Sequence, residues 1–125
     1  MAKWANDIVM DGALDITASG TRMYVCSAQP ANFTEASSTY ALADVTLDSG
    51  AFSKANGDTS GRKVTIAAQT DILIDASGTA THVAIARASD STLLIVTTCT
   101  SQALTANGSN TVNVPAFDEE FADPS

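Results

Sequence analysis

Apolar and polar residues alternate most clearly over residues 79–100, where two runs of β-forming residues flank a short polar segment. That segment, 88–91, is made of the small or polar residues typical of a hairpin loop. In the first run Val83 and Ile85 alternate with smaller residues, so they face the same side of a strand. The second run holds four consecutive aliphatic residues, 93–96, which predicts a strand covered on both faces. We therefore expect this β-hairpin to form the centre of the sheet.

The first apolar stretch of the chain predicts a short helix. Asn6 or Asp7 is placed to cap it, and the apolar spacing over 8–16 suits one face of a helix. A strand is the competing interpretation, because Gly12 weakens a helix at this point. A second helical segment is expected over 34–43, with its first residue as the cap.

Further strands are expected at 22–27, at 62–69 and through Val112 and Val114, each bounded by residues that favour turns. Pro115 ends the last of them, because proline cannot donate a hydrogen bond to the ladder. The acidic tail, 116–125, alternates aromatic and acidic residues. It forms either an edge strand or a loosely held terminus.

These elements predict a mainly β fold in one domain, 1–125. The expected architecture is an antiparallel β-sandwich or barrel with one or two short helices near the N-terminal half. Hydrophobic residues make up 45% of the 125 residues, but many of them are alanine and only 6% are aromatic. Such a light core leaves little stability to spare, and oligomerisation is one way to bury more surface.

The charge balance argues against nucleic acid as a partner. Fourteen acidic residues against six basic ones give a net charge of −8. The basic residues are scattered, and Arg62 and Lys63 are the only adjacent pair, so no basic cluster is available for phosphates. No apolar segment follows Lys3, and the longest run of large aliphatic residues is 93–96. We therefore expect neither a secretory signal nor a membrane span, and synthesis in a cytoplasm.

The sequence contains no recognisable catalytic or cofactor motif. His82 is the only histidine, and its neighbours supply neither a nucleophile nor a carboxylate, so we interpret it as structural. Asp71 and Asp75 fall on one face if their segment is a strand, but acids that end an apolar run are typical of solvated strand termini. We expect no enzymatic activity, no cofactor and no metal site.

Two thiols and four aromatic residues are the remaining candidates for specific roles. Cys26 and Cys99 are interpreted as buried, reduced cysteines, with a disulfide within or between chains as the alternative. Four aromatic side chains are candidates for contacts with a partner: Trp4, Phe33, Phe117 and Phe121. Local packing is the alternative for the first two.

Six segments carry a resemblance that covers nearly the whole chain. They are MAKWAND at 1–7, CSAQP at 26–30, TYALADV at 39–45, GDTSGRKV at 57–64, DASGTATHVA at 75–84 and TTCTSQALT at 97–105. In these segments the chain resembles a set of small, mostly uncharacterised proteins from the genomes of tailed bacteriophages.

The resemblance implies a virion structural protein without enzymatic residues. A capsid decoration or cement protein, made in the host cytoplasm and bound to the major capsid protein or other virion proteins, is the leading expectation. A homo-oligomer is expected, and the local three-fold positions of icosahedral shells suggest a trimer. The alternatives are a tail, fibre or baseplate accessory protein, or a soluble module that binds a cation or a carbohydrate.

Overall fold

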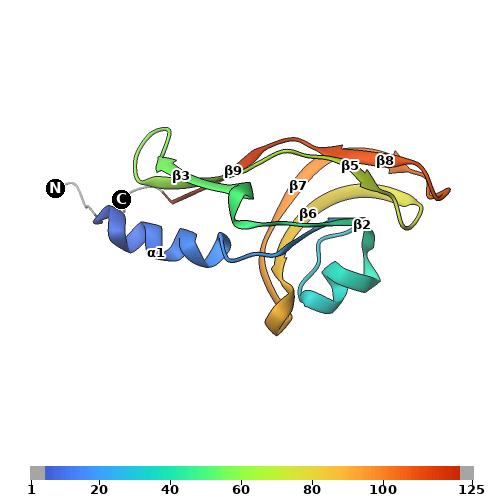
Figure 1. Ribbon diagram of the computed structural model, residues 1–125, viewed down its shortest axis with the longest axis horizontal. Helices are drawn as coiled ribbons and strands as arrows, with labels where there is room; N and C mark the ends of the chain where they lie inside the picture. The colour runs from blue at the N-terminus through green and yellow to red at the C-terminus, as the bar shows by residue number, and fades with distance from the viewer. Residues whose placement is uncertain (1–4, 122–125) are drawn as a thin grey trace.

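The largest sheet has four antiparallel strands in the order β2-β1-β6-β7 (Figure 1). The computed structural model describes residues 5–121. The strands of this sheet are β1 (Arg22–Cys26), β2 (Ala41–Thr46), β6 (Gly78–Arg87) and β7 (Thr92–Leu104). A short 3₁₀ turn, Ala88–Asp90, joins β6 to β7 and confirms the predicted hairpin.

Two smaller antiparallel sheets complete the β structure. One contains β3 (Phe52–Asn56), β4 (Arg62–Ile66) and β9 (Phe117–Phe121) in the order β3-β4-β9, and the other pairs β5 (Gln69–Leu73) with β8 (Thr111–Val114). β8 ends before Pro115, as predicted. The tail residues that were expected either to pair or to be loose form β9, which pairs with β4 at the edge of its sheet.

β4 and β5 follow one another closely in the chain, and β8 and β9 do the same, so each pair forms one interrupted strand. Ile66 pairs with Phe117 before the interruption, and Gln69 pairs with Val114 after it. The interruption of the second strand falls at 115–116, where a proline removes a backbone donor. The long antiparallel ribbon therefore changes from one sheet to the next without a reversal of the chain.

The main core lies on one face of the four-stranded sheet. Val83 and Ile85 contribute to it from β6, together with Val64 and Ile66 from β4 and Leu14 from the helix. A smaller cluster covers the opposite face of the sheet, and its members are Tyr24, Cys26, Ala36, Ala84 and Ala86. The predicted alternation along β6 is therefore confirmed, with large aliphatic residues on the main core and alanines on the other side. The mainly β, antiparallel fold is confirmed as well, and the choice between a sandwich and a barrel stays a prediction.

β7 lies at the edge of the four-stranded sheet, so the prediction of a central, fully covered strand at 93–96 is wrong. The ladder pairs Ile85 with Ile95 and Ala86 with Leu93, so Leu94 is the extra residue of a β-bulge. Because of the bulge, Leu94 and Ile95 both pack on the main core, whereas Leu93 and Val96 pack on the smaller cluster. The unbroken aliphatic run thus reflects a bulged edge strand, and all four side chains are only half-buried.

The helix α1 (Asp7–Thr17) confirms the first predicted helix, and the side chain of Asn6 caps it by accepting a hydrogen bond from the Ile8 amide at 2.8 Å. Its buried face differs from the one expected. Met10, Leu14 and Thr17 point inward, whereas Ile8 is largely exposed.

The second predicted helical segment is shorter than expected. A π-helical turn covers Glu35–Thr39, and β2 already begins at Ala41, so the helical prediction is wrong for the last three residues of 34–43. Asn32, not Thr34, supplies the cap, because its side chain accepts the hydrogen bond of the Glu35 amide at 2.9 Å. A 3₁₀ turn at Ser49–Ala51 precedes β3, a strand that the sequence pattern did not predict.

Candidate functional site

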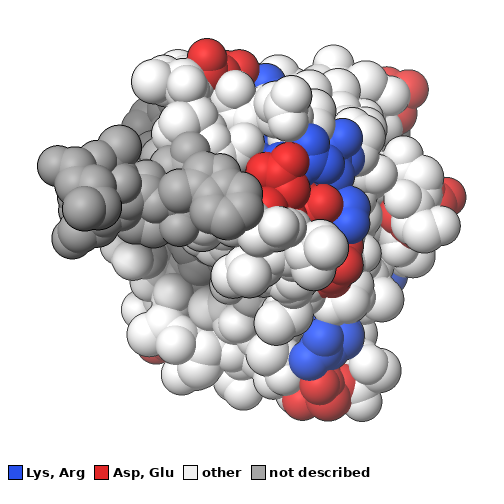
Figure 2. Space-filling model, turned by 90° about the vertical axis from the view of Figure 1, so that its left-hand side faces the viewer, with Lys and Arg blue, Asp and Glu red and all other residues white. Residues whose placement is uncertain are grey.

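Each basic side chain in the described part of the chain lies in an ion pair. The pairs are Arg22–Asp44, Lys54–Asp15, Arg62–Asp11, Lys63 with both Asp58 and Asp118, and Arg87–Asp90. Figure 2 views the end of the molecule where α1 and β3 lie and shows basic groups next to acidic ones, with broad uncharged areas around them. In the described part of the chain, the charged side chains outside these pairs are therefore acidic.

Two of these ion pairs hold α1 on the β3–β4 hairpin. Arg62 Nε donates to Asp11 Oδ1 at 2.8 Å, and Arg62 Nη1 donates to Asn56 Oδ1 at 2.9 Å. The hydrogen bond from Arg62 lowers the pKa of the Asp11 carboxyl. One helical turn further on, Lys54 pairs with Asp15. Because Asp11 and Asp15 are four residues apart, the two pairs fix one side of the helix.

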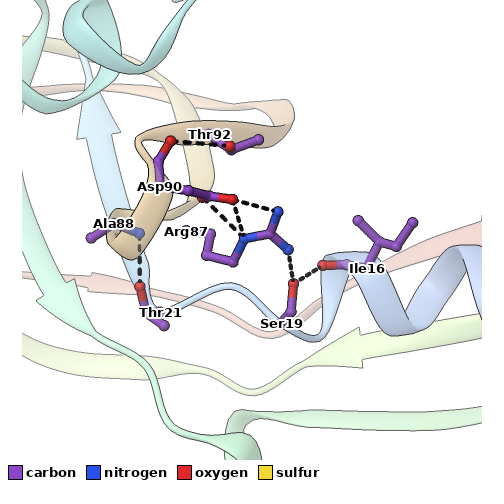
Figure 3. A network of polar contacts seen from close by, with 7 residues as sticks. All are labelled: Ile16, Ser19, Thr21, Arg87, Ala88, Asp90 and Thr92. Atoms are coloured by element: carbon purple, nitrogen blue, oxygen red, sulfur yellow. Dashed lines mark hydrogen bonds and ion pairs between the residues drawn. The ribbon is translucent and has the colours of Figure 1, made fainter.

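A polar network fixes the C-terminal end of the helix to the β6–β7 hairpin (Figure 3). Arg87 Nη1 donates to Ser19 Oγ at 2.7 Å, and Ser19 Oγ in turn donates to the carbonyl of Ile16 in the last turn of α1. Arg87 also binds both carboxylate oxygens of Asp90, with distances of 2.9–3.1 Å. The guanidinium thus joins the hairpin loop to the C-terminal end of the helix, where a positive charge is favourable.

The remaining side of α1 is apolar and exposed, and we regard it as the candidate functional site. Its large side chains are Ile8, Val9 and Ile16, with exposed fractions of 79%, 68% and 58%. The small residues Gly12 and Ala13 lie between them and are also exposed. We call these five residues the α1 outer face. A β-carbon added at Gly12 would have no neighbour within 4 Å, so packing within the chain does not require glycine there.

Sequence reasoning missed this face because it assigned all the apolar residues of the segment to one buried stripe. The helix carries two apolar stripes, and the acidic residues decide which one is buried. Asp11 and Asp15 lie beside Met10 and Leu14, and their basic partners stand on β3 and β4. The acids next to one stripe of the predicted helix are the signal that was available; their basic partners, Lys54 and Arg62, stand on a hairpin that the sequence pattern did not predict.

The predicted aromatic contacts lie in different surroundings. Trp4 lies outside the described residues. Phe33 packs edge-on against Tyr24, with ring centroids 6.2 Å apart and planes at 86°, which favours the local-packing alternative for this residue. Phe117 is half-buried against the main core, and Phe121, at the end of β9, is 39% exposed. The structure brings none of the three described aromatic side chains onto the α1 outer face.

The two cysteines are free and lie on opposite faces of the main sheet. Cys26 is fully buried in the smaller cluster, where its thiol donates to the Ala36 carbonyl at 3.6 Å. Burial, with a smaller contribution from Cys99, raises the pKa of Cys26 to about 11. Cys99 is half-buried against the main core and lines a cavity of about 240 Å³ between β7 and the start of β9.

The polar candidates stand apart from one another. His82 is half-buried on β6, and the Oγ1 atom of the adjacent Thr81 lies 2.8 Å from its Nδ1. Asp71 lies in a β-bulge with a left-handed backbone (φ 57°), and its amide donates to Asn113 Oδ1 at 2.9 Å. Asp75 lies beyond the end of β5. Over residues 5–121, no group of three or more His, Cys, Asp or Glu side chains is arranged to hold a metal ion.

The chain matches no protein-family model, no curated protein and no solved structure. No helix in the described part combines the length and the hydrophobicity that crossing a bilayer requires.

Proposed function

We propose that this protein is a non-enzymatic structural component of a bacteriophage particle, and that it decorates the capsid by binding and stabilising the shell. The resemblance of six segments to small tailed-phage proteins motivates the proposal. The structural observation that supports it is the α1 outer face, an exposed apolar surface on a helix that is fixed along one side and at its C-terminal end. A rigid apolar surface suits docking, because no ordering of the helix is required when it binds.

Burial of this face would supply a useful share of a binding free energy. Full burial of an aliphatic side chain such as Ile8 or Ile16 contributes about 1.5–3 kcal/mol relative to exposure. A shell offers many equivalent sites, and the occupancy of each is set by the affinity at that site. The partner would be the major capsid protein or another virion protein with an apolar surface of its own.

The first test is the copy number of the protein in purified particles, measured by quantitative mass spectrometry. A copy number comparable to that of the major capsid protein is the expected result. A few copies per particle would instead support the alternative, a tail, fibre or baseplate accessory protein. Absence from the particles would overturn both assignments.

A second test asks whether the α1 outer face is the docking surface. The triple variant Ile8→Ser, Val9→Ser, Ile16→Ser should lose co-sedimentation with shells from which the protein is absent. The matched control, Leu73→Ser with Phe121→Ser, removes exposed apolar side chains elsewhere and should still bind. Equal loss by both variants, or full binding by the triple variant, would contradict docking through α1. Far-ultraviolet circular dichroism verifies that each variant is folded.

A further inference from the structure

β7 is the longest strand of the structure, and it leaves one edge of the main sheet open. It spans 13 residues, pairs with β6 on one side, and ends the strand order of its sheet. Its sequence, TLLIVTTCTSQAL, contains neither a charged residue nor a proline. Charges, prolines and short lengths are the usual protections of an edge strand against pairing with another chain.

Other described edges carry the protection that β7 lacks. β3 and β9 have five residues each; β3 carries Lys54, and β9 carries three consecutive acids. β8 has only four residues and is followed by Pro115. The contrast within one chain marks β7 as an edge whose open hydrogen-bonding groups are available to another strand.

The opposite edge of the main sheet, formed by β2, is covered by the chain itself. Ala43 forms an antiparallel bridge with Ile74, and the Leu42 carbonyl accepts hydrogen bonds from the amides of Asp75 and Ala76 at 2.8 and 3.1 Å. The first half of β2 is therefore already paired within the same copy. Over the described residues, β7 is the edge strand of this sheet for which no such bridge is formed.

We propose that β7 pairs antiparallel with β7 of a second copy of this chain, across a two-fold axis, so that two four-stranded sheets become one of eight strands. An interface of this kind uses the same edge on both copies, so the assembly is complete as a dimer. Pairing of two different edges would instead leave free edges and build open fibres. The proposal does not depend on attachment to a shell.

Charge favours a second copy as the occupant of the edge. The chain carries a net charge of −8, so two copies repel one another over most of their surfaces. In a two-fold pair each residue faces the same strand of its partner, and like charges directly opposite one another are destabilising. A 13-residue strand without charge lets two copies approach along this edge with no like charges directly opposite one another.

The side chains of β7 also have surface left to bury. Leu93, Leu94, Ile95 and Val96 are half-buried, and they point to both faces of the sheet. A strand added alongside β7 would cover these side chains from the open edge. Between its two irregularities β7 keeps a regular register over 95–98, which gives the partner strand an undistorted segment to pair with.

The test compares two double lysine variants that change the charge equally. Thr98→Lys with Thr100→Lys places charges at exposed positions of β7, and Thr70→Lys with Thr111→Lys places them at exposed positions of β5 and β8. Sedimentation velocity from 1 to 200 µM should give a wild-type dimer of twice the 12.8 kDa chain mass. The β7 variant should dissociate with a dimer dissociation constant raised about tenfold or more, and the β5–β8 variant should not change.

Several outcomes would overturn the proposal: a wild-type monomer at every concentration, a trimer, a dimer that the β7 variant leaves intact, or equal dissociation of both variants. Hydrogen exchange of the wild-type protein covers the case in which the β7 variant fails to fold. Exchange at β7 amides should slow as the concentration rises, while exchange in β9 stays constant. Exchange in β7 that is independent of concentration would also overturn it.

Discussion

The Arg62 guanidinium lies 2.8 Å from the carboxylate of Asp11 and joins α1 to β4 across 51 positions of the chain. This contact lies beside the apolar stripe of the helix that packs on the sheet. The stripe that includes Leu14 is buried, and the stripe that includes Ile8 is left to solvent.

Replacement of Asp11 by Asn should make folding less sensitive to acid. The pKa of Asp11 is lowered, first by the hydrogen bond from Arg62, so its carboxylate stabilises the folded state above the ordinary value of 3.8. That stabilisation is lost as the pH falls through the lowered pKa. Urea unfolding at pH 7 and pH 3 should therefore show a smaller difference for Asp11→Asn than for the wild type. Asp75→Asn, a change at an exposed acid, should retain the wild-type difference.

Replacement of Leu14 by Ala should destabilise the fold strongly. Leu14 is fully buried in the main core, and truncation of such a side chain costs about 2–5 kcal/mol. The same truncation at Ile16, which is 58% exposed, should change the free energy of unfolding by less than about 0.5 kcal/mol. Similar losses for both variants in urea unfolding would mean that the helix buries a different face.

Alanine at Gly12, inside α1, and alanine at Gly20, three residues after its end, should act in opposite directions. A β-carbon at Gly20 would lie 2.5 Å from Ile85 Cγ2 and 3.2 Å from the Thr17 carbonyl, so Gly20→Ala should cost about 1–3 kcal/mol. At Gly12 the space is open, and Gly12→Ala should stabilise the helix by about 0.5–1 kcal/mol. Thermal unfolding of the two variants measures both shifts, and shifts of the same sign would contradict this assignment.

The two thiols should differ in reactivity. Cys26 is buried, and its pKa is raised to about 11, so a thiol reagent at pH 8 should modify it only after unfolding. Cys99 is half-buried beside a cavity and should react first in the native protein. Because the pKa of Cys26 is raised in the folded protein, the free energy of unfolding should fall as the pH rises from the ordinary thiol value of 9.0 towards about 11.

Mass spectrometry of the labelled protein, with Cys99→Ser as the control, identifies the reacting thiol. Non-reducing gels of fresh particles should show monomer mobility, in keeping with two free cysteines. A reducible ladder of larger species would instead indicate disulfides between subunits.

The sequence predicts those parts of the fold that depend on local pattern. Alternation along β6, the loop at 88–91, the cap at Asn6 and the stop at Pro115 are each determined by a few neighbouring residues, and the structure confirms them. The mainly β, antiparallel class follows from these elements.

The features that the sequence did not predict depend on contacts between distant segments. β7 lies at an edge, although its aliphatic run is typical of a central strand, and the bulge at Leu94 distributes that run over both faces of the sheet. The exposed side of α1 is selected by Arg62 and Lys54, which stand on other elements. The early start of β2 at Ala41 follows from its pairing with β1, which outweighs the helical tendency of the residues before it.

The attachment of α1 at two points has a mechanical consequence. One side of the helix is fastened to the β3–β4 hairpin and its C-terminal end to the β6–β7 hairpin, and the two hairpins belong to different sheets. A pull on the helix is therefore shared between both sheets. A partner that binds the α1 outer face is therefore connected, through the helix, to both of these sheets.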